Sequence, residues 1–91
     1  AISRDITIIV DQNIEAQRII RQAGAKKSEL VEDLCLLDVF QGDPIPFGKK
    51  SASLRVTYRS NVKTLEDEDI RSLHETITQG IIDAFAATLP G

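Results

Sequence analysis

The spacing of apolar side chains changes repeatedly along this sequence, and that change is its strongest constraint on the fold. Residues 51–60 alternate between apolar and polar side chains, which is the period of a strand with one buried face. Residues 67–85 repeat apolar side chains at spacings of three and four, which is the period of a helix with one buried side. A chain that has both periods buries its apolar surface by packing helices against a sheet.

The same periods predict the order of elements along the whole chain. The order is a strand at 3–10, a helix at 14–23, strands at 30–40 and 51–60, a helix at 67–85 and a short strand at 86–89. Asn13 is expected to cap the first helix and Gly24 to follow its end. In 91 residues this order is typical of the α+β, ferredoxin-like split βαβ sandwich. There, two helices cover one face of an antiparallel sheet and the other face stays open.

Length and composition predict one domain over residues 1–91, because the chain is too short for two. No stretch approaches the roughly 20 consecutive apolar residues of a membrane span, so no membrane partner is expected. The single cysteine cannot form an internal disulfide, and neither a secretory signal nor an N-glycosylation sequon is visible. A cytoplasmic location is therefore expected.

Alternation predicts which side chains of the two middle strands face the helices and which face outward. The inward set is Cys35, Leu37, Val39, Ala52, Leu54, Val56 and Tyr58. The outward set is Asp38, Phe40, Ser51, Ser53, Arg55 and Thr57. A carboxylate, an aromatic ring, hydroxyls and a cation on one flat surface can stack on a nucleobase and bind its edges. The alternative is the ordinary polar cover of an open sheet face.

Positive charge is local rather than general. The whole chain has a net charge of −3, whereas residues 41–60 hold four basic residues and one acidic residue. A polyanion is therefore expected to contact this segment and no other. Lys49 and Lys50 either neutralise backbone phosphates or are solvated loop charges.

Three other features are interpreted as structural. His74 has no second histidine and no nearby cysteine with which to bind a metal, so it is expected at the surface or at the boundary of the core. Cys35 is interpreted as a small buried hydrophobic residue. The acidic residues 66–69 open the long helix, where negative charge stabilises the positive end of the helix dipole. The apolar stripe of that helix comprises Ile70, Leu73, Ile77, Ile81, Ala84 and Phe85.

A set of short motifs resembles one known family. The motifs are Leu37–Phe40, Gly42, Ile45–Pro46, Gly48–Ser51, Thr64–Leu65, Asp67–Ile70, His74–Glu75 and Ile77. They resemble the ferredoxin-fold anticodon-binding domain at the C-terminus of the bacterial phenylalanyl-tRNA synthetase beta subunit. The resemblance runs from Ser3 to Leu89, and the Gly-Lys-Lys-Ser and Thr-Leu motifs are its most specific part. The chain departs from the family pattern at Phe40, usually Tyr, at Glu66, usually Thr, and at Pro90–Gly91, often Leu-Arg.

The resemblance implies a non-catalytic domain of an ATP-dependent phenylalanine–tRNA ligase. Its implied partners are the anticodon stem–loop of phenylalanine tRNA, the rest of the beta subunit and the alpha subunit. The parent enzyme would use ATP and magnesium, and this domain no cofactor. Asp38, Phe40 and Ser51 match the family's base-contacting positions. With Ser53, Arg55, Lys49 and Lys50 they form the predicted RNA-binding set.

The chemistry of the bases agrees with that implication. The anticodon of phenylalanine tRNA is GAA, as the resemblance implies. Guanine presents two parallel donors that one carboxylate can accept together, whereas adenine and uracil present only one each. Asp38 can therefore prefer guanine, while Phe40 packs on the ring and Ser51 meets its acceptors.

Two rival functions share this topology. A small-molecule regulatory domain would bind its ligand between helices and loops at a dimer interface, and would not need four cations beside an open sheet. A small phosphatase-like enzyme would need an arginine in its first strand–helix turn, where Val10–Asn13 supplies an acid instead.

Overall fold

The computed structural model describes residues 1–25 and 29–90. The elements are β1 (Ile2–Asp11), α1 (Ala16–Ala25), β2 (Val31–Phe40), β3 (Lys49–Tyr58) and α2 (Asp67–Phe85). This is the order that the periodicity predicts, and the bounds of α2 are those predicted. The strand bounds differ from the predicted ones by one or two residues.

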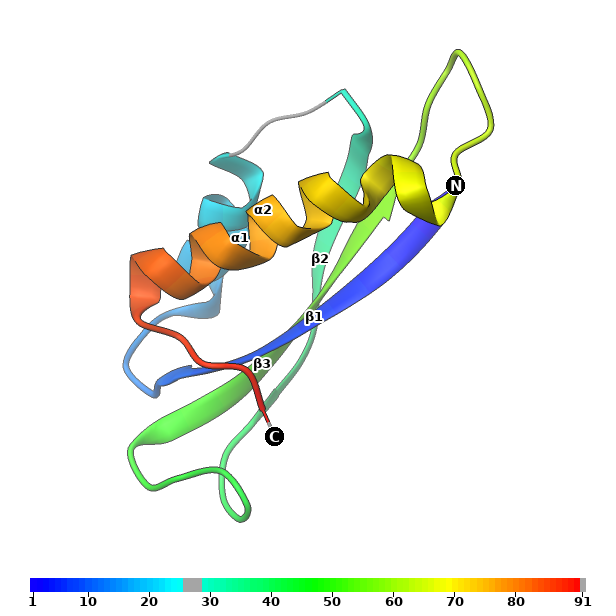
Figure 1. Cartoon of the computed structure of the whole chain (residues 1–91). Coiled ribbons are helices and arrows are strands. Elements are labelled where there is room, and N and C mark those ends of the chain that lie inside the picture. The colour runs from blue at the N-terminus through cyan, green and yellow to red at the C-terminus, as the bar shows by residue number, and fades with distance from the viewer. Residues whose placement is uncertain (26–28, 91) are drawn as a thin grey trace.

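The three strands form one antiparallel sheet in the order β1-β3-β2. Both helices lie on the same face of the sheet, and the other face is left open (Figure 1). After α2 the chain returns to the outer edge of β1, where Ile9 and Thr88 exchange backbone hydrogen bonds of 2.8 and 3.0 Å. This bridge stands where the short last strand is predicted. The fold is therefore the predicted α+β, ferredoxin-like sandwich.

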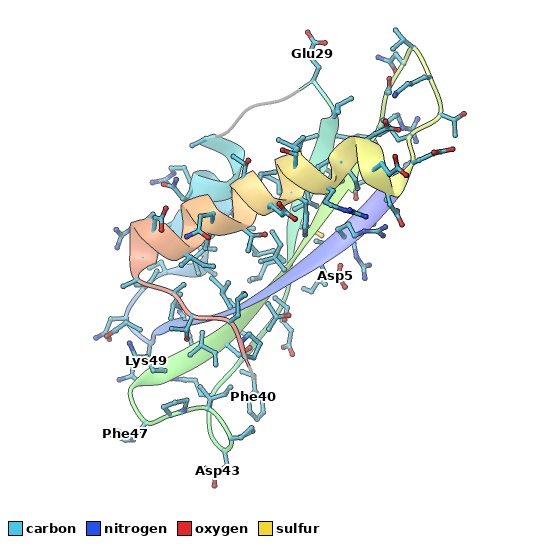
Figure 2. The ribbon with its side chains drawn as sticks, in the orientation of Figure 1. Asp5, Glu29, Phe40, Asp43, Phe47 and Lys49 are labelled. Atoms are coloured by element: carbon cyan, nitrogen blue, oxygen red, sulfur yellow. The ribbon has the colours of Figure 1, made fainter. Side chains whose placement is uncertain are left out.

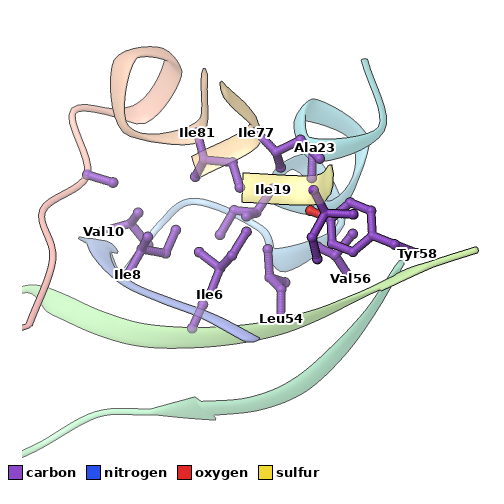
Figure 3. Close-up of a cluster of buried hydrophobic side chains, with 13 residues drawn as sticks. Ile6, Ile8, Val10, Ile19, Ala23, Leu54, Val56, Tyr58, Ile77 and Ile81 are labelled. Atoms are coloured by element: carbon purple, nitrogen blue, oxygen red, sulfur yellow. The ribbon is translucent and has the colours of Figure 1, made fainter. Parts of the chain in front are cut away.

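The core fills the space between the helices and the covered face of the sheet (Figure 3). Its fully enclosed side chains come from β1, α1, β3 and α2, and they include Ile8, Ile19, Leu54, Val56, Tyr58, Ile77 and Ile81. The predicted stripe of α2 supplies Ile70, Ile77 and Ile81, but Ala84 is exposed. At one end of the core the Tyr58 hydroxyl and Nδ1 of the half-buried His74 share a 2.7 Å hydrogen bond.

The acidic start of α2 has the predicted structural role. Asp69 Oδ2 accepts a 2.8 Å hydrogen bond from the backbone N–H of Glu66, and Asp69 Oδ1 accepts one of 2.9 Å from Lys63 Nζ. Asp67 pairs with Arg4 of β1. Three carboxylates in the first turn also complement the helix dipole.

The start of α1 is a correction to the sequence analysis. The helix begins at Ala16, so Asn13 does not cap it. Instead, Asp11 Oδ1 accepts a 2.8 Å hydrogen bond from the Asn13 N–H, which makes a local turn after β1. Gly24 lies inside α1 rather than after it, and a Cβ there would sit 3.6 Å from Leu34 Cδ1.

The second correction concerns β2, whose pairing with β3 shifts twice. The register breaks between Val31 and Asp33 and between Leu36 and Asp38. Each extra residue reverses the alternation of the strand. Cys35 is therefore paired with Arg55 on the open face and half exposed, not buried against the helices. Leu37 is an unpaired bulge residue, 42 % exposed.

Beyond the second bulge the predicted faces hold. Val39 pairs with Ala52 on the covered side but remains 40 % exposed, whereas Asp38 and Phe40 pair with Ser53 and Ser51 on the open side. Among the described helices, neither is both long and apolar enough to cross a membrane.

Candidate nucleic-acid interface

The open face is built as cross-strand rows centred on β3, because each β3 residue from Ser51 to Tyr58 has one neighbour on β1 and one on β2. Directly paired residues point to the same side of an antiparallel sheet. The rows, each written from β1 through β3 to β2, are Ser3–Thr57–Asp33, Asp5–Arg55–Cys35, Thr7–Ser53–Asp38 and Ile9–Ser51–Phe40. The outward set predicted from the sequence thus lies on one surface. The β1 members of the rows and Cys35 extend that surface.

Asp38 and Phe40 lie together near the end of the open face. Both are exposed, and Phe40 keeps 48 % of its surface accessible. Among the described residues Asp38 has no hydrogen-bond or ion-pair partner, so both carboxylate oxygens are available to a ligand. Figure 2 shows Phe40, Phe47 and Lys49 at the same end of the molecule, beyond the helices.

The two serines of the predicted set differ in their partners. The Ser53 hydroxyl shares a 3.0 Å hydrogen bond with Thr7 Oγ1, which occupies part of its capacity. Ser51 stands between Ile9 and Phe40, and its hydroxyl has no partner in residues 1–25 and 29–90. Ser51 is therefore the better placed of the two to bind an acceptor on a base.

Arg55 is held by a carboxylate on the neighbouring strand. Its Nε donates to Asp5 Oδ1 at 2.9 Å, and its Nη2 donates to Asp5 Oδ2 at 3.3 Å. The hydrogen bond from Arg55 lowers the pKa of the Asp5 carboxyl, and the same bond raises the pKa of Arg55. Both groups are therefore charged at neutral pH.

The structure separates the two adjacent lysines. Lys49 pairs with Asp11 at the open-face parity of β3 and is exposed, whereas Lys50 pairs with Val10 at the covered-face parity and is half buried. The reason is that β3 begins at Lys49, so the pair belongs to a strand and alternates. The open face therefore receives Lys49 alone.

The loop between β2 and β3 closes this end of the molecule. Gly42 and Gly48 adopt positive φ angles of 98° and 84°, which other residues rarely adopt. The Gln41 side chain donates to Gln12 Oε1 at 3.1 Å, and the Gln12 N–H donates to the Gly48 carbonyl at 3.0 Å. Phe47 projects from the loop fully exposed.

His74 lies outside this surface, as expected of a boundary histidine. Burial lowers its pKa, with a smaller contribution from the Arg4 charge, so the imidazole is neutral at pH 7. Within residues 1–25 and 29–90 no three His, Cys, Asp or Glu side chains gather as metal ligands.

Sequence reasoning did not assign the β1 residues of the open face. The alternation of the first strand does place Asp5, Thr7 and Ile9 on one side. That signal becomes useful only once β1 is known to lie beside β3, because only then do Asp5 and Arg55 face each other.

Comparison with known proteins identifies the family. A family model described as the ferredoxin-fold anticodon binding domain matches residues 1–90. The chain belongs to this family. Curated relatives include the phenylalanine–tRNA ligase beta subunit of Syntrophus aciditrophicus, 42 % identical over 85 residues, which cover 93 % of this chain and 11 % of that protein. The same subunit of Syntrophotalea carbinolica is 39 % identical over 88 residues, which cover 97 % and 11 %.

A third relative is the phenylalanine–tRNA ligase beta subunit of Geobacillus kaustophilus. It is 37 % identical over 94 aligned positions, which cover 100 % of this chain and 11 % of that protein. The chain thus spans about a tenth of the length of the curated relatives it matches.

Proposed function

We propose that this chain is the anticodon-binding domain of a cytoplasmic phenylalanine–tRNA ligase beta subunit, and that it binds the anticodon stem–loop of phenylalanine tRNA. The stem–loop lies on the open face and against the 41–50 loop. ATP and magnesium are used by the catalytic part of the ligase, which lies outside this chain, and the alpha subunit and the rest of the beta subunit are its protein partners.

The observation that carries the proposal is the pair Asp38 and Phe40, exposed on one side of β2 and opposite two serines. An unpartnered carboxylate beside an exposed ring combines hydrogen bonding with stacking, the two interactions used to read unpaired bases. The family and its relatives support the identity of the RNA.

Each residue of the site has a distinct part in the proposal. Asp38 accepts the N1–H and the exocyclic amine of guanine at the first anticodon position. Phe40 packs on a base, and Ser51 donates to a base acceptor. Ser53 lies beside Asp38 and is held there by its hydrogen bond with Thr7. Lys49 attracts the phosphate backbone.

The modest positive charge of the surface is consistent with this role. A domain that contacts one end of a tRNA already held by a large enzyme gains affinity from the other contacts. A regulatory ligand site between helices is the less supported alternative, since family membership and the exposed base-reading pair both favour RNA.

An amide chemical-shift titration of the 15N-labelled chain tests the proposal. A stem–loop with the GAA anticodon should shift the amides of 38–40, 51–55 and the 41–50 loop, and leave the outward sides of α1 and α2 unchanged. A stem–loop altered at the first anticodon base should bind more weakly. Shifts confined to the helices, or equal binding of both RNAs, would contradict the proposal.

A further inference from the structure

The ion pair between Asp5 and Arg55 crosses the middle of the open face, one row from Thr7–Ser53–Asp38. The two side chains remain 50 % and 46 % exposed, and ion pairs of this exposure add little to folding stability. A negative charge in the middle of a surface that binds RNA also repels phosphate. Neither stability nor attraction of RNA therefore explains Asp5.

The geometry of the pair leaves one edge of the Arg55 guanidinium without a hydrogen-bond partner among the described residues. Asp5 takes the side of the guanidinium formed by Nε and Nη2. A guanidinium carries five N–H donors, so both protons of Nη1 and the second proton of Nη2 remain. One N–H from each of these nitrogens points in parallel from the free end, which matches two oxygens of one phosphate group.

We propose that Asp5 is a positioning residue, which holds Arg55 across the sheet so that its free edge binds one phosphate group of the RNA. The inference rests on the proposed function and adds a fixed anchor beside Asp38. Because the pair carries no net charge, the contact depends on orientation more than on attraction. A phosphate fixed there sets the position of the strand, and so determines which base lies over Asp38.

The distinguishing test is Asp5→Asn, compared with Asp33→Asn in the assembled ligase. Asp33 is an aspartate of the same face, exposed, and without an ion pair to the described residues. It lies at the far end from Phe40. If charge alone matters, both variants remove one repulsive charge and tighten binding. If Asp5 positions Arg55, Asp5→Asn should weaken binding of phenylalanine tRNA by at least about threefold, as coupled contacting residues do, while Asp33→Asn binds as well as wild type or better.

Arg55→Lys separates positioning from general structure. Lysine keeps the positive charge but lacks the parallel N–H donors of the guanidinium. Adding Asp5→Asn to Arg55→Lys should therefore weaken binding no further. An equal loss in both backgrounds, or a Tm lowered in proportion to the loss of affinity, would overturn the inference.

Neutral methylphosphonate linkages, placed one at a time in a synthetic anticodon stem–loop, locate the phosphate. One linkage should weaken binding to the wild-type ligase and have little effect on the Asp5→Asn ligase. If no single linkage in the loop weakens binding in this way, the proposed phosphate contact is wrong. If the wild-type ligase does not discriminate the anticodon at all, the proposed function fails. If it does, and Asp5→Asn behaves like Asp33→Asn, this inference alone fails.

Discussion

At the scale of single residues, the reading of guanine is expected to depend on Asp38. Asp38→Ala removes the paired acceptor and should cost about 1–3 kcal/mol in discrimination, by analogy with bidentate base contacts in general. Asp38→Asn should be nearly as harmful, because its amide presents a donor toward a donor of guanine. The measurement is the aminoacylation efficiency of the assembled ligase with normal tRNA and with tRNA altered at the first anticodon base.

Folding provides the control for Asp38. An exposed side chain with no partner in residues 1–25 and 29–90 supports little of the core, so neither variant should change the Tm. Wild-type efficiency and fidelity in the variants would remove Asp38 from the site. Equal losses on both tRNAs with a lower Tm would make it a structural residue of the loop.

His74 should make stability depend on pH near neutrality. Burial lowers its pKa below the usual 6.5, so the unfolded chain binds a proton that the folded chain does not. The free energy of unfolding is therefore highest above about pH 6.5 and falls as the pH drops toward the lowered pKa. Asp5 and Asp69 also have lowered pKa values, and they add a second loss below about pH 4.

Urea unfolding of the chain at half-unit steps from pH 7.5 to 5 measures this dependence. His74→Gln, which keeps a hydrogen-bond acceptor for Tyr58, should flatten the curve in that range, and further steps down to about pH 3 should still show the loss below pH 4. An unchanged curve in the variant would assign the dependence to other groups.

At the scale of elements, the alternation of β3 predicts different effects of two adjacent lysines. Lys49→Ala removes an exposed charge at the open face and should weaken all stem–loops alike. It should reduce the log–log salt slope of binding by about 0.7–0.9. Lys50→Ala is the matched control, since Lys50 points to the covered side and should change the slope little. Equal effects of the two variants would mean that both reach phosphates, and a loss confined to the cognate stem–loop would mean that Lys49 reads bases.

At the scale of the whole molecule, one small core joins the sheet to both helices. The chain should therefore unfold in one cooperative transition, with a free energy of roughly 5–14 kcal/mol. Ile77→Ala, at a side chain 1 % exposed, should cost about 2–5 kcal/mol in a urea titration. Ala84→Ser, on the exposed side of α2, should change the value by less than about 0.5 kcal/mol. Similar losses in the two variants, or two separate transitions, would contradict a single core.

Local periodicity determined much of this protein. The bounds of α2 follow from a long apolar stripe and an acidic first turn, and the two faces of β3 follow from strict alternation. Both features depend only on neighbours in the sequence, which is why the sequence alone predicts them. Alternation also predicts that Asp38 and Phe40 face outward, but their pairing with Ser53 and Ser51 depends on the register of β2.

Tertiary structure decided the features that depend on partners far along the chain. Two bulges in β2 turn Cys35 to the open face, because strand register is set by packing against β3 and not by the strand's own pattern. Asp5 and Arg55 stand 50 positions apart and meet only because β1 lies beside β3. Lys49 and Lys50 separate because β3 starts at Lys49, where pairing with Asp11 begins. In each case a contact between strands, rather than a local preference, determined which side chain faces the open surface.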